Sequence, residues 1–260
     1  MPALATTDLS APDALAAVWR ADQLGHAQGG VVATGFGALD AVLPGGGWPL
    51  GSLTEILLPA PGLPVWQLLL PALALQLRQA PGPLVLVAPP CEPFMPHLQG
   101  RGLPVTRLLR VQPGRGAGAL WACEQALRCG EVCAVLVWLS AARNAELRRL
   151  QLAAQQQGRL LFVLRGEAAQ HESSPARLRL LVGPLDGAGA LPVQVLKRRG
   201  PPVLAPLRLP AHAPTLAALL AALAPVPAPA CATVLPFTSV RRAGARGTGR
   251  HALDRPAAQR

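Results

Sequence analysis

The chain has 260 residues, of which 51% are hydrophobic and 14% are charged. This combination predicts one sizeable folded core with tails and excludes a mainly disordered chain. Lys and Arg outnumber Asp and Glu by 24 to 13, and the net charge of +11 favours polyanions or acidic protein surfaces as partners. Pro, Gly or Arg interrupts each apolar run before it reaches the length of a membrane span, and the N-terminus lacks the pattern of a signal peptide. We therefore expect a cytoplasmic protein with no membrane contact.

The first part of the chain alternates between apolar runs and amphipathic segments. After a helix at 14–24 and a turn-rich lead-in at 34–51, strands are expected at 52–58, 83–90, 106–113, 132–140 and 159–165. Helices are expected between them at 65–79, 94–102, 118–130 and 142–158, with Pro71 as a kink or a reset of the first of these. In the last helix Leu147, Leu150, Leu152 and Ala154 are expected to face inward. This alternation predicts an α/β fold in which helices cover both faces of a parallel sheet.

The pattern changes after residue 175. Three strand-like pieces, at 176–185, 191–202 and 203–210, are expected to be antiparallel strands at one edge of the sheet. A helix at 214–225 and a Pro/Ala spacer follow, and the Arg-rich end has almost nothing to bury. We therefore divide the chain into a helical lead-in (1–30), a core (31–210), a helix with a spacer (211–236) and a basic tail that we expect to be disordered (237–260).

The five cysteines and five histidines show no spacing typical of metal ligands. We expect no metal site, and we expect the cysteines to be reduced and mostly buried. Cys129 and Cys133 leave a redox pair open as an alternative to two small buried side chains that flank a strand.

The order of these segments resembles a known core. The stretch TGFGALDAVLPGGGWPLGSLTEIL is similar to the entry into the ATPase core of RecA-type recombinases, and ALWACEQALRCGEVCAVLVWLSA resembles its Walker B helix and strand. Within that superfamily LPGGGWPLGSLTEIL, LVAPP, ALWACEQALRCG and VLKRRGPP together look most like the ImuA family, over roughly residues 15–210. The resemblance implies a RecA-like P-loop NTPase core with a mostly parallel twisted sheet and antiparallel edge strands toward the C-terminus.

The residues that bind and cleave nucleotides are missing from this core. A phosphate-binding loop reads G-x-x-x-x-G-K-[ST], whereas the equivalent turn here contains Pro59, Gly62, Pro64 and Val65, and no lysine occurs before His171. Trp138 stands where a Walker B strand has the aspartate that holds the metal. Because lysine, hydroxyl and aspartate are lost together, we expect neither a nucleotide cofactor nor ATPase activity.

Two further expectations concern the same end of the sheet. Glu92, which follows LVAPPC, is interpreted as an exposed loop residue rather than as a general base. The ligand-binding crevice is expected to be filled by Pro, Leu and Trp side chains, with Trp66 and Trp138 as candidates.

The resemblance therefore implies a protein that works by contact in SOS-linked translesion synthesis. Its implied partners are ImuB, the inactive polymerase homologue, and through it the error-prone polymerase and the sliding clamp, with RecA and direct DNA binding as further candidates. On this interpretation the protein joins the nucleoid during DNA damage. A SulA-like inhibitor that binds the division GTPase and a divergent RecA-type ATPase stay open as alternatives.

Basic residues in two places are candidates for contacts with a partner or with nucleic acid. The first group, at a predicted strand end, is Lys197, Arg198 and Arg199, and the second, in the tail, is Phe237, Arg241, Arg242, Arg246 and Arg250. The alternative for the first group is a solvated strand end that prevents unwanted strand pairing. The alternative for the second group is a solubilising terminus.

Overall fold

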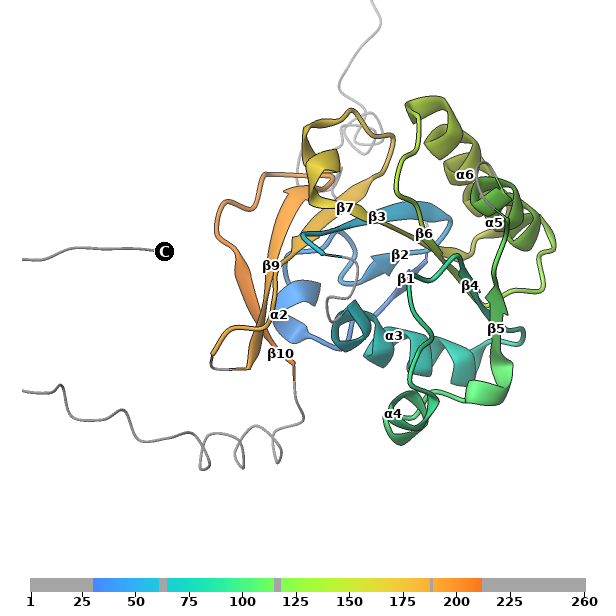
Figure 1. Cartoon of the computed structure of the whole chain (residues 1–260). Helices are drawn as coiled ribbons and strands as arrows, with labels where there is room; N and C mark the ends of the chain where they lie inside the picture. Colours follow the sequence, from blue (N-terminus) through green and yellow to red (C-terminus); the bar gives the residue numbers. More distant parts are fainter. Residues whose placement is uncertain (1–29, 61–64, 115–117, 188, 212–260) are drawn as a thin grey trace, which may run out of the picture. The chain divides into compact units, whose positions relative to one another are not determined.

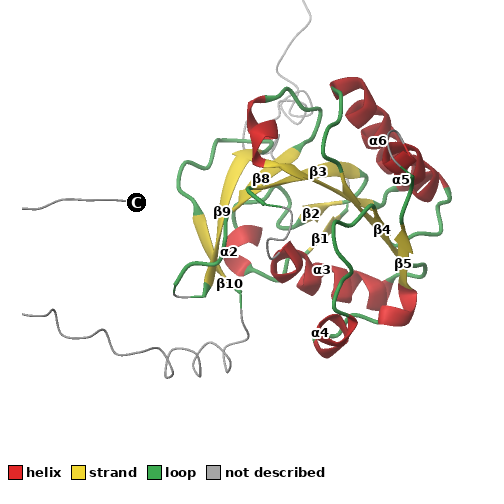
Figure 2. Ribbon diagram, viewed as in Figure 1, coloured by secondary structure: helices red, strands yellow, loops and turns green. Residues whose placement is uncertain are grey.

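The computed structural model describes residues 30–60, 65–114, 118–187 and 189–211. These residues form an eight-stranded sheet in the order β10-β9-β8-β3-β7-β6-β4-β5 (Figures 1 and 2). The strands are β3 (Ser52–Leu58), β4 (Leu84–Val87), β5 (Leu108–Val111), β6 (Ala134–Trp138), β7 (Leu160–Gly166), β8 (Leu178–Val182), β9 (Ala190–Lys197) and β10 (Leu207–Pro210). All seven residues of β3 and all four of β4 are buried, as expected for parallel strands that are covered on both faces.

Helices cover both faces of this sheet. On one face α3 (Val65–Gln79) packs in the larger hydrophobic core, and on the other α5 (Gly118–Arg128) and α6 (Asn144–Gln157) pack in the second core. Shorter helical segments are α2 (Gly37–Asp40), α4 (Met95–Gly100), η2 (Val105–Arg107) and η3 (Glu167–His171). Within the described residues no helix is long and apolar enough to cross a membrane.

The turn-rich lead-in folds into a small unit on the face of the sheet that α3 covers. β1 (Val31–Val32) pairs antiparallel with β2 (Trp48–Pro49), and α2 lies between them in the chain. Trp48 is fully buried, and its ring packs edge-on against Phe162 of β7 with ring centroids 5.3 Å apart. The Asp40 carboxylate accepts a hydrogen bond from the Thr34 backbone N–H at 2.9 Å, which closes the turn.

Most of the expected elements are confirmed within two or three residues of their predicted bounds. The helix at 65–79 begins and ends where the sequence predicted, and Pro71 lies inside it rather than resetting its start. The expected strands 52–58 and 159–165 correspond to β3 and β7. The predicted helices at 14–24 and 214–225, the spacer and the basic tail lie outside the described residues.

Three expectations were wrong in part. β8 is parallel to β3, and the antiparallel arrangement begins with β9, because η3 and its loop return the chain to the opposite end of the sheet before β8 starts. Leu152 is 58% exposed, since the buried stripe of α6 runs through Leu147, Leu150 and Ala154 instead. Of the cysteines that the structure describes, Cys123 and Cys133 are buried but Cys91 and Cys129 are exposed.

Candidate functional site

The carboxyl ends of five strands surround a cavity of the described core. In an open α/β sheet this edge is where ligands bind. The cavity has a volume of about 420 Å³. Its walls come from the ends of β3 to β7 and from the first turn of α5, and the residues are Leu58, Pro59, Ala88, Pro90, Pro113, Gly114, Ala119, Leu120, Trp138, Leu139, Ser140, Ala141, Leu164, Arg165 and Gly166. The expectation of a filled crevice does not hold for the described residues, because their Pro, Leu and Trp side chains form the walls of the cavity.

Only part of the predicted phosphate loop is described. Pro59 follows β3 and lines the cavity, while Gly62 and Pro64 lie outside the described residues. Val65 begins α3, and its side chain is buried in the larger hydrophobic core. A valine at this position has no hydroxyl to offer to a magnesium ion, and a proline has no backbone N–H to offer to a phosphate.

Trp138 is the last residue of β6, and its side chain forms part of the cavity wall. It also packs against the larger hydrophobic core, as does Trp66, which does not line the cavity. Glu92 is exposed over 73% of its side chain and lies 4.0 Å from Arg110, so it is an exposed loop residue, as expected. Within the described residues no group of three or more His, Cys, Asp or Glu side chains is placed to hold a metal ion.

Arg165 is the one charged residue among the described residues that line the cavity. It lies near the end of β7 and is only 4% exposed. Its Nη1 donates to Glu55 Oε1 at 2.9 Å, and its Nη2 donates to Glu172 Oε2 at 2.7 Å. Burial alone would lower the pKa of Arg165, but its hydrogen bonds to the carboxylates of Glu172 and Glu55, together with their negative charges, outweigh burial and raise this pKa. The cavity therefore contains a permanent cation whose charge is already balanced within the protein.

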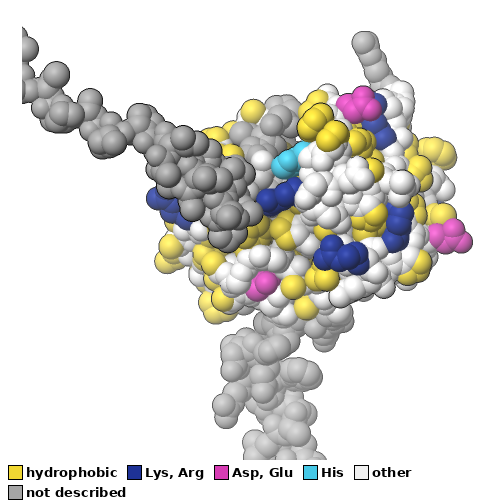
Figure 3. Space-filling view, turned by 90° about the horizontal axis from the view of Figure 1, so that it is seen from below, with side chains coloured by type: hydrophobic (Ala, Val, Ile, Leu, Met, Phe, Trp, Pro, Cys, Tyr) yellow, Lys and Arg dark blue, Asp and Glu magenta, His cyan; other side chains and the backbone are white. Residues whose placement is uncertain are grey.

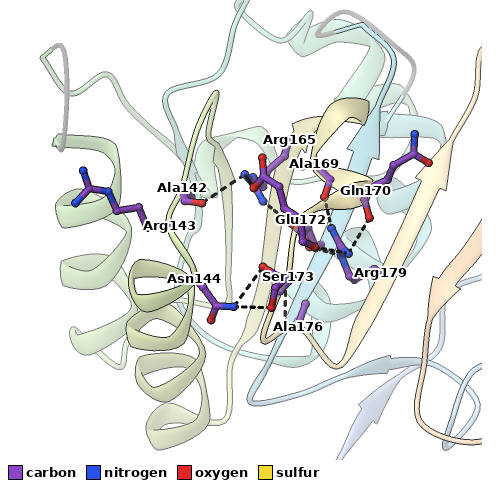
Figure 4. A network of polar contacts seen from close by, with 12 residues as sticks. Ala142, Arg143, Asn144, Arg165, Ala169, Gln170, Glu172, Ser173, Ala176 and Arg179 are labelled. Carbon is purple, nitrogen blue, oxygen red and sulfur yellow. Dashed lines mark hydrogen bonds and ion pairs between the residues drawn. The ribbon is translucent and has the colours of Figure 1, made fainter.

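A second buried arginine completes this network (Figure 4). Arg179 of β8 donates from Nε to Glu55 Oε2 at 2.6 Å and from Nη2 to the Ala169 carbonyl at 2.6 Å. Its Nη1 donates to the Glu172 carbonyl at 3.2 Å, so one side chain holds η3 and the following loop against the sheet. The start of α6 is tied to the same loop, because Asn144 Nδ2 donates to Ser173 Oγ at 2.9 Å.

The network was missed at the sequence level, although a signal was present. Glu55, Arg165 and Arg179 each stand inside an apolar strand, in SLTEILL, RLLFVLR and LRLLV. Charges in strands that are buried on both faces must pair with one another or with backbone groups. Together with Glu172, the network contains two carboxylates and two guanidinium groups, so its net charge is zero.

Ala88 is another residue that sequence reasoning missed. It follows β4, lines the cavity and has a φ of 53°, which is unusual for a residue other than glycine. Its backbone N–H donates to the Val111 carbonyl at 2.9 Å, and this hydrogen bond holds the unusual conformation. Backbone strain of this kind is concentrated at sites where a fold binds ligands or partners.

The three predicted basic residues at the end of β9 have different environments. Arg198 donates to the carbonyls of Val42 and Pro201 and therefore joins the lead-in unit to the edge of the sheet. Lys197 Nζ donates to the Ser174 carbonyl at 2.9 Å and stays exposed. Arg199 is exposed and lines a small cavity together with Arg177, which the sequence did not single out. The predicted residues Phe237, Arg241, Arg242, Arg246 and Arg250 lie outside the described residues.

Basic side chains are not confined to this strand end. In Figure 3 Lys and Arg side chains are spread over one face of the molecule among apolar ones, with few acidic side chains between them. This distribution agrees with the excess of basic residues in the chain and offers acidic partners several points of contact.

Comparison with known proteins identifies the architecture. The crystal structure of the RadB recombinase is similar with a TM-score of 0.53 and 17% sequence identity, over 68% of this chain and 95% of that one. The chain has a RecA-like fold. At this level of identity the similarity establishes the fold alone.

A second resemblance concerns the middle of the chain. The family model "Cell division inhibitor SulA" matches residues 51–161, from the start of β3 into β7. The cell division inhibitor SulA of Edwardsiella piscicida is 35% identical over 92 residues, which are 35% of this chain and 55% of that protein. This chain thus spans about half the length of the curated relative that it matches. These similarities place the core in the RecA/SulA-like superfamily.

Proposed function

We propose that this protein is a non-catalytic, RecA-like accessory factor in SOS-linked translesion DNA synthesis, and that it acts by binding other proteins. The observation that carries the proposal is the chemistry of the carboxyl-end cavity. Its described walls contain no carboxylate to hold a metal, Trp138 occupies the place of the Walker B aspartate, and Arg165 is already paired. Phosphoryl transfer depends on electrostatic stabilisation by lysine, magnesium and its ligands, so a fold without them is suited to recognition.

The segments outside the SulA match support an ImuA-like role. Of the motifs that resemble ImuA, LPGGGWPLGSLTEIL begins in the lead-in unit before the matched residues, and VLKRRGPP covers the end of β9 and the turn after it. These segments meet in the fold, because Arg198 donates to the Val42 carbonyl and Arg198 follows β9 directly. The partners we propose are an ImuB-type polymerase homologue, through it the error-prone polymerase and sliding clamp, and RecA.

A SulA-like role is the second candidate, because the family model and the relative from Edwardsiella piscicida both carry that name. In that case the partner is the division GTPase, and overproduction of the protein arrests septation. In this role too the fold works by contact, so the two candidates differ in partner and not in chemistry.

Two measurements test the proposal. The first is titration of the full chain with a fluorescent ATP analogue and magnesium, with an active RecA-type ATPase as the positive control. We expect no saturable binding at micromolar concentrations, and saturable binding would overturn the non-catalytic role in favour of a divergent ATPase.

The second measurement compares partners. Purified ImuB-type protein, RecA and the division GTPase are each passed over the immobilised full chain and over a chain that ends at Pro236. Retention of ImuB-type protein or RecA supports the translesion role, and retention of the division GTPase alone supports the SulA-like role. If both chains retain the same partner equally, residues 237–260 do not form the binding segment.

A further inference from the structure

A groove between α5 and α6 exposes a tryptophan at the surface. The two helices lie side by side on one face of the sheet (Figure 1). The groove has a volume of about 230 Å³, and its lining residues are Leu120, Trp121, Glu124, Glu146, Arg149 and Leu150. Trp121 is 65% exposed, although its neighbours Ala122 and Cys123 are buried. Tryptophan is the residue type most enriched at the energetic centre of protein interfaces, so its exposure here marks a candidate contact.

The carboxylates in the groove are already occupied within the protein. Glu124 is buried and forms ion pairs with Arg128, at 2.7 Å, and with Arg149. Glu146 accepts a hydrogen bond from the Arg143 backbone N–H at 2.7 Å, at the start of α6. An incoming basic group would have to break these contacts, and an incoming acidic group would not.

Exposed arginines lie in the groove and next to it. Arg149 lines the groove, Arg128 forms an ion pair with Glu124 of the groove, and Arg143 is exposed directly before α6, where its backbone N–H donates to Glu146. These three arginines against Glu124 and Glu146 leave this surface with an excess of one positive charge. An apolar centre with a charged rim is the usual composition of a protein interface.

We propose that this groove binds an acidic peptide segment of a partner protein. An apolar side chain of the segment inserts between Leu120 and Leu150 beside Trp121, and its carboxylates contact the exposed guanidinium groups of Arg128 and Arg149. Leu120 also lines the carboxyl-end cavity, so the apolar surface continues from the groove toward that cavity. This inference rests on the proposed role in protein binding and names the surface and the partner chemistry for it.

Charge and shape favour this occupant over two others. A second copy of this chain would bring a protein of net charge +11 to a surface that is itself positive. Single-stranded DNA binds on successive aromatic platforms along a basic groove, whereas Trp121 is the one aromatic side chain among the described residues that line this groove. The groove has the size of one or two side chains rather than of a nucleotide strand.

The test uses the full chain and fluorescence anisotropy of labelled probes. The probes are a peptide of Glu, Asp and Leu, a peptide of the same length with Ser in place of Leu, a peptide of Lys and Leu, and oligo-dT. We expect the Glu/Asp/Leu peptide to bind best, and salt to weaken that binding. Trp121→Ala should weaken it by about tenfold or more, and Arg149→Glu by several-fold. Leu152→Ala is the matched control, because Leu152 is also exposed on α6 but does not line the groove.

The remaining outcomes contradict the proposal. If the Ser-containing peptide binds as well as the Leu-containing one, the groove contributes nothing beyond charge. Equal affinities of wild type and Trp121→Ala, with far-UV circular dichroism unchanged, place the contact elsewhere. Preference for oligo-dT that is lost in Trp121→Ala assigns the groove to nucleic acid. None of these results depends on ATP binding, so they are distinguishable from a failure of the non-catalytic role.

Discussion

Glu55 and Arg179 are 124 residues apart in the chain, yet Arg179 Nε lies 2.6 Å from Glu55 Oε2 inside the sheet. Glu55 is fully buried, and its other oxygen accepts a hydrogen bond from Arg165. One carboxylate on β3 therefore joins the two strands that flank it. Because Arg165 lines the carboxyl-end cavity, its pairing with Glu55 also neutralises a positive charge in the wall of that cavity.

Replacement of Glu55 by Gln should destabilise the fold strongly. The amide keeps the size of the side chain but leaves the buried Arg179 without its anion and Arg165 with Glu172 alone, and such a loss costs about 3–5 kcal/mol. The free energy of unfolding is measured by urea denaturation. Glu92→Gln is the control, since Glu92 is exposed and its contact with Arg110 is long, and we expect a change below about 0.5 kcal/mol. Equal stabilities of Glu55→Gln and wild type would show that the network contributes nothing to the fold.

Gly35 and Gly37 in the lead-in turn should respond in opposite ways to alanine. Gly35 has a φ of 87°, and an added Cβ would lie 2.4 Å from the Cβ of Pro71 in α3. We expect Gly35→Ala to lower the free energy of unfolding by about 2–4 kcal/mol, from backbone strain and overpacking together. Gly37 lies in α2 with open space around it, so Gly37→Ala should be neutral or slightly stabilising. Thermal unfolding of both variants distinguishes them, and similar melting temperatures would contradict the close contact with Pro71.

The buried thiols predict a loss of stability at alkaline pH. Burial, with a smaller effect of the Glu124 charge, raises the pKa of Cys123 far above its ordinary value of 9.0. Burial also raises the pKa of Cys133, and it outweighs the opposite effect of Arg107 and Arg159. Above pH 9 the unfolded chain loses these protons while the folded chain keeps them, so stability falls as pH rises, by up to about 1.4 kcal/mol per pH unit for each thiol.

Urea denaturation at pH 8 and pH 10 measures this effect. The chain has no Tyr and a single Lys, so few other side chains titrate in this range. Cys123→Ala should show a smaller loss between the two pH values than wild type. Cys129→Ala, at an exposed position, should behave as wild type. A loss of the same size in Cys123→Ala and wild type would mean that this thiol does not cause it.

Arg198 and Arg199 should differ although they are neighbours. Arg198 donates to two backbone carbonyls, so Arg198→Ala should cost about 1–3 kcal/mol of stability. Arg199 is exposed, and Arg199→Ala should leave stability within about 0.5 kcal/mol of wild type.

If the chain binds single-stranded DNA at this strand end, Arg199→Ala and Arg177→Ala should each lower the slope of log affinity against log salt by about 0.7. An unchanged slope in both variants would exclude a phosphate contact there.

The sequence by itself determined the α/β class, the bounds of β3 and α3, those of β7 within one residue, and the absence of a G-x-x-x-x-G-K-[ST] motif. Apolar runs, helical periodicity and missing lysine or aspartate residues are properties of neighbouring positions, so they can be read along the chain. Tertiary structure decided the rest. The direction of β8 and the pairing of Glu55 with Arg165 and Arg179 depend on how segments more than a hundred residues apart pack together. The exposure of Leu152 and Trp121 depends on how α5 and α6 pack against each other and against the sheet. A residue's own neighbours in the chain do not specify which distant side chain will meet it.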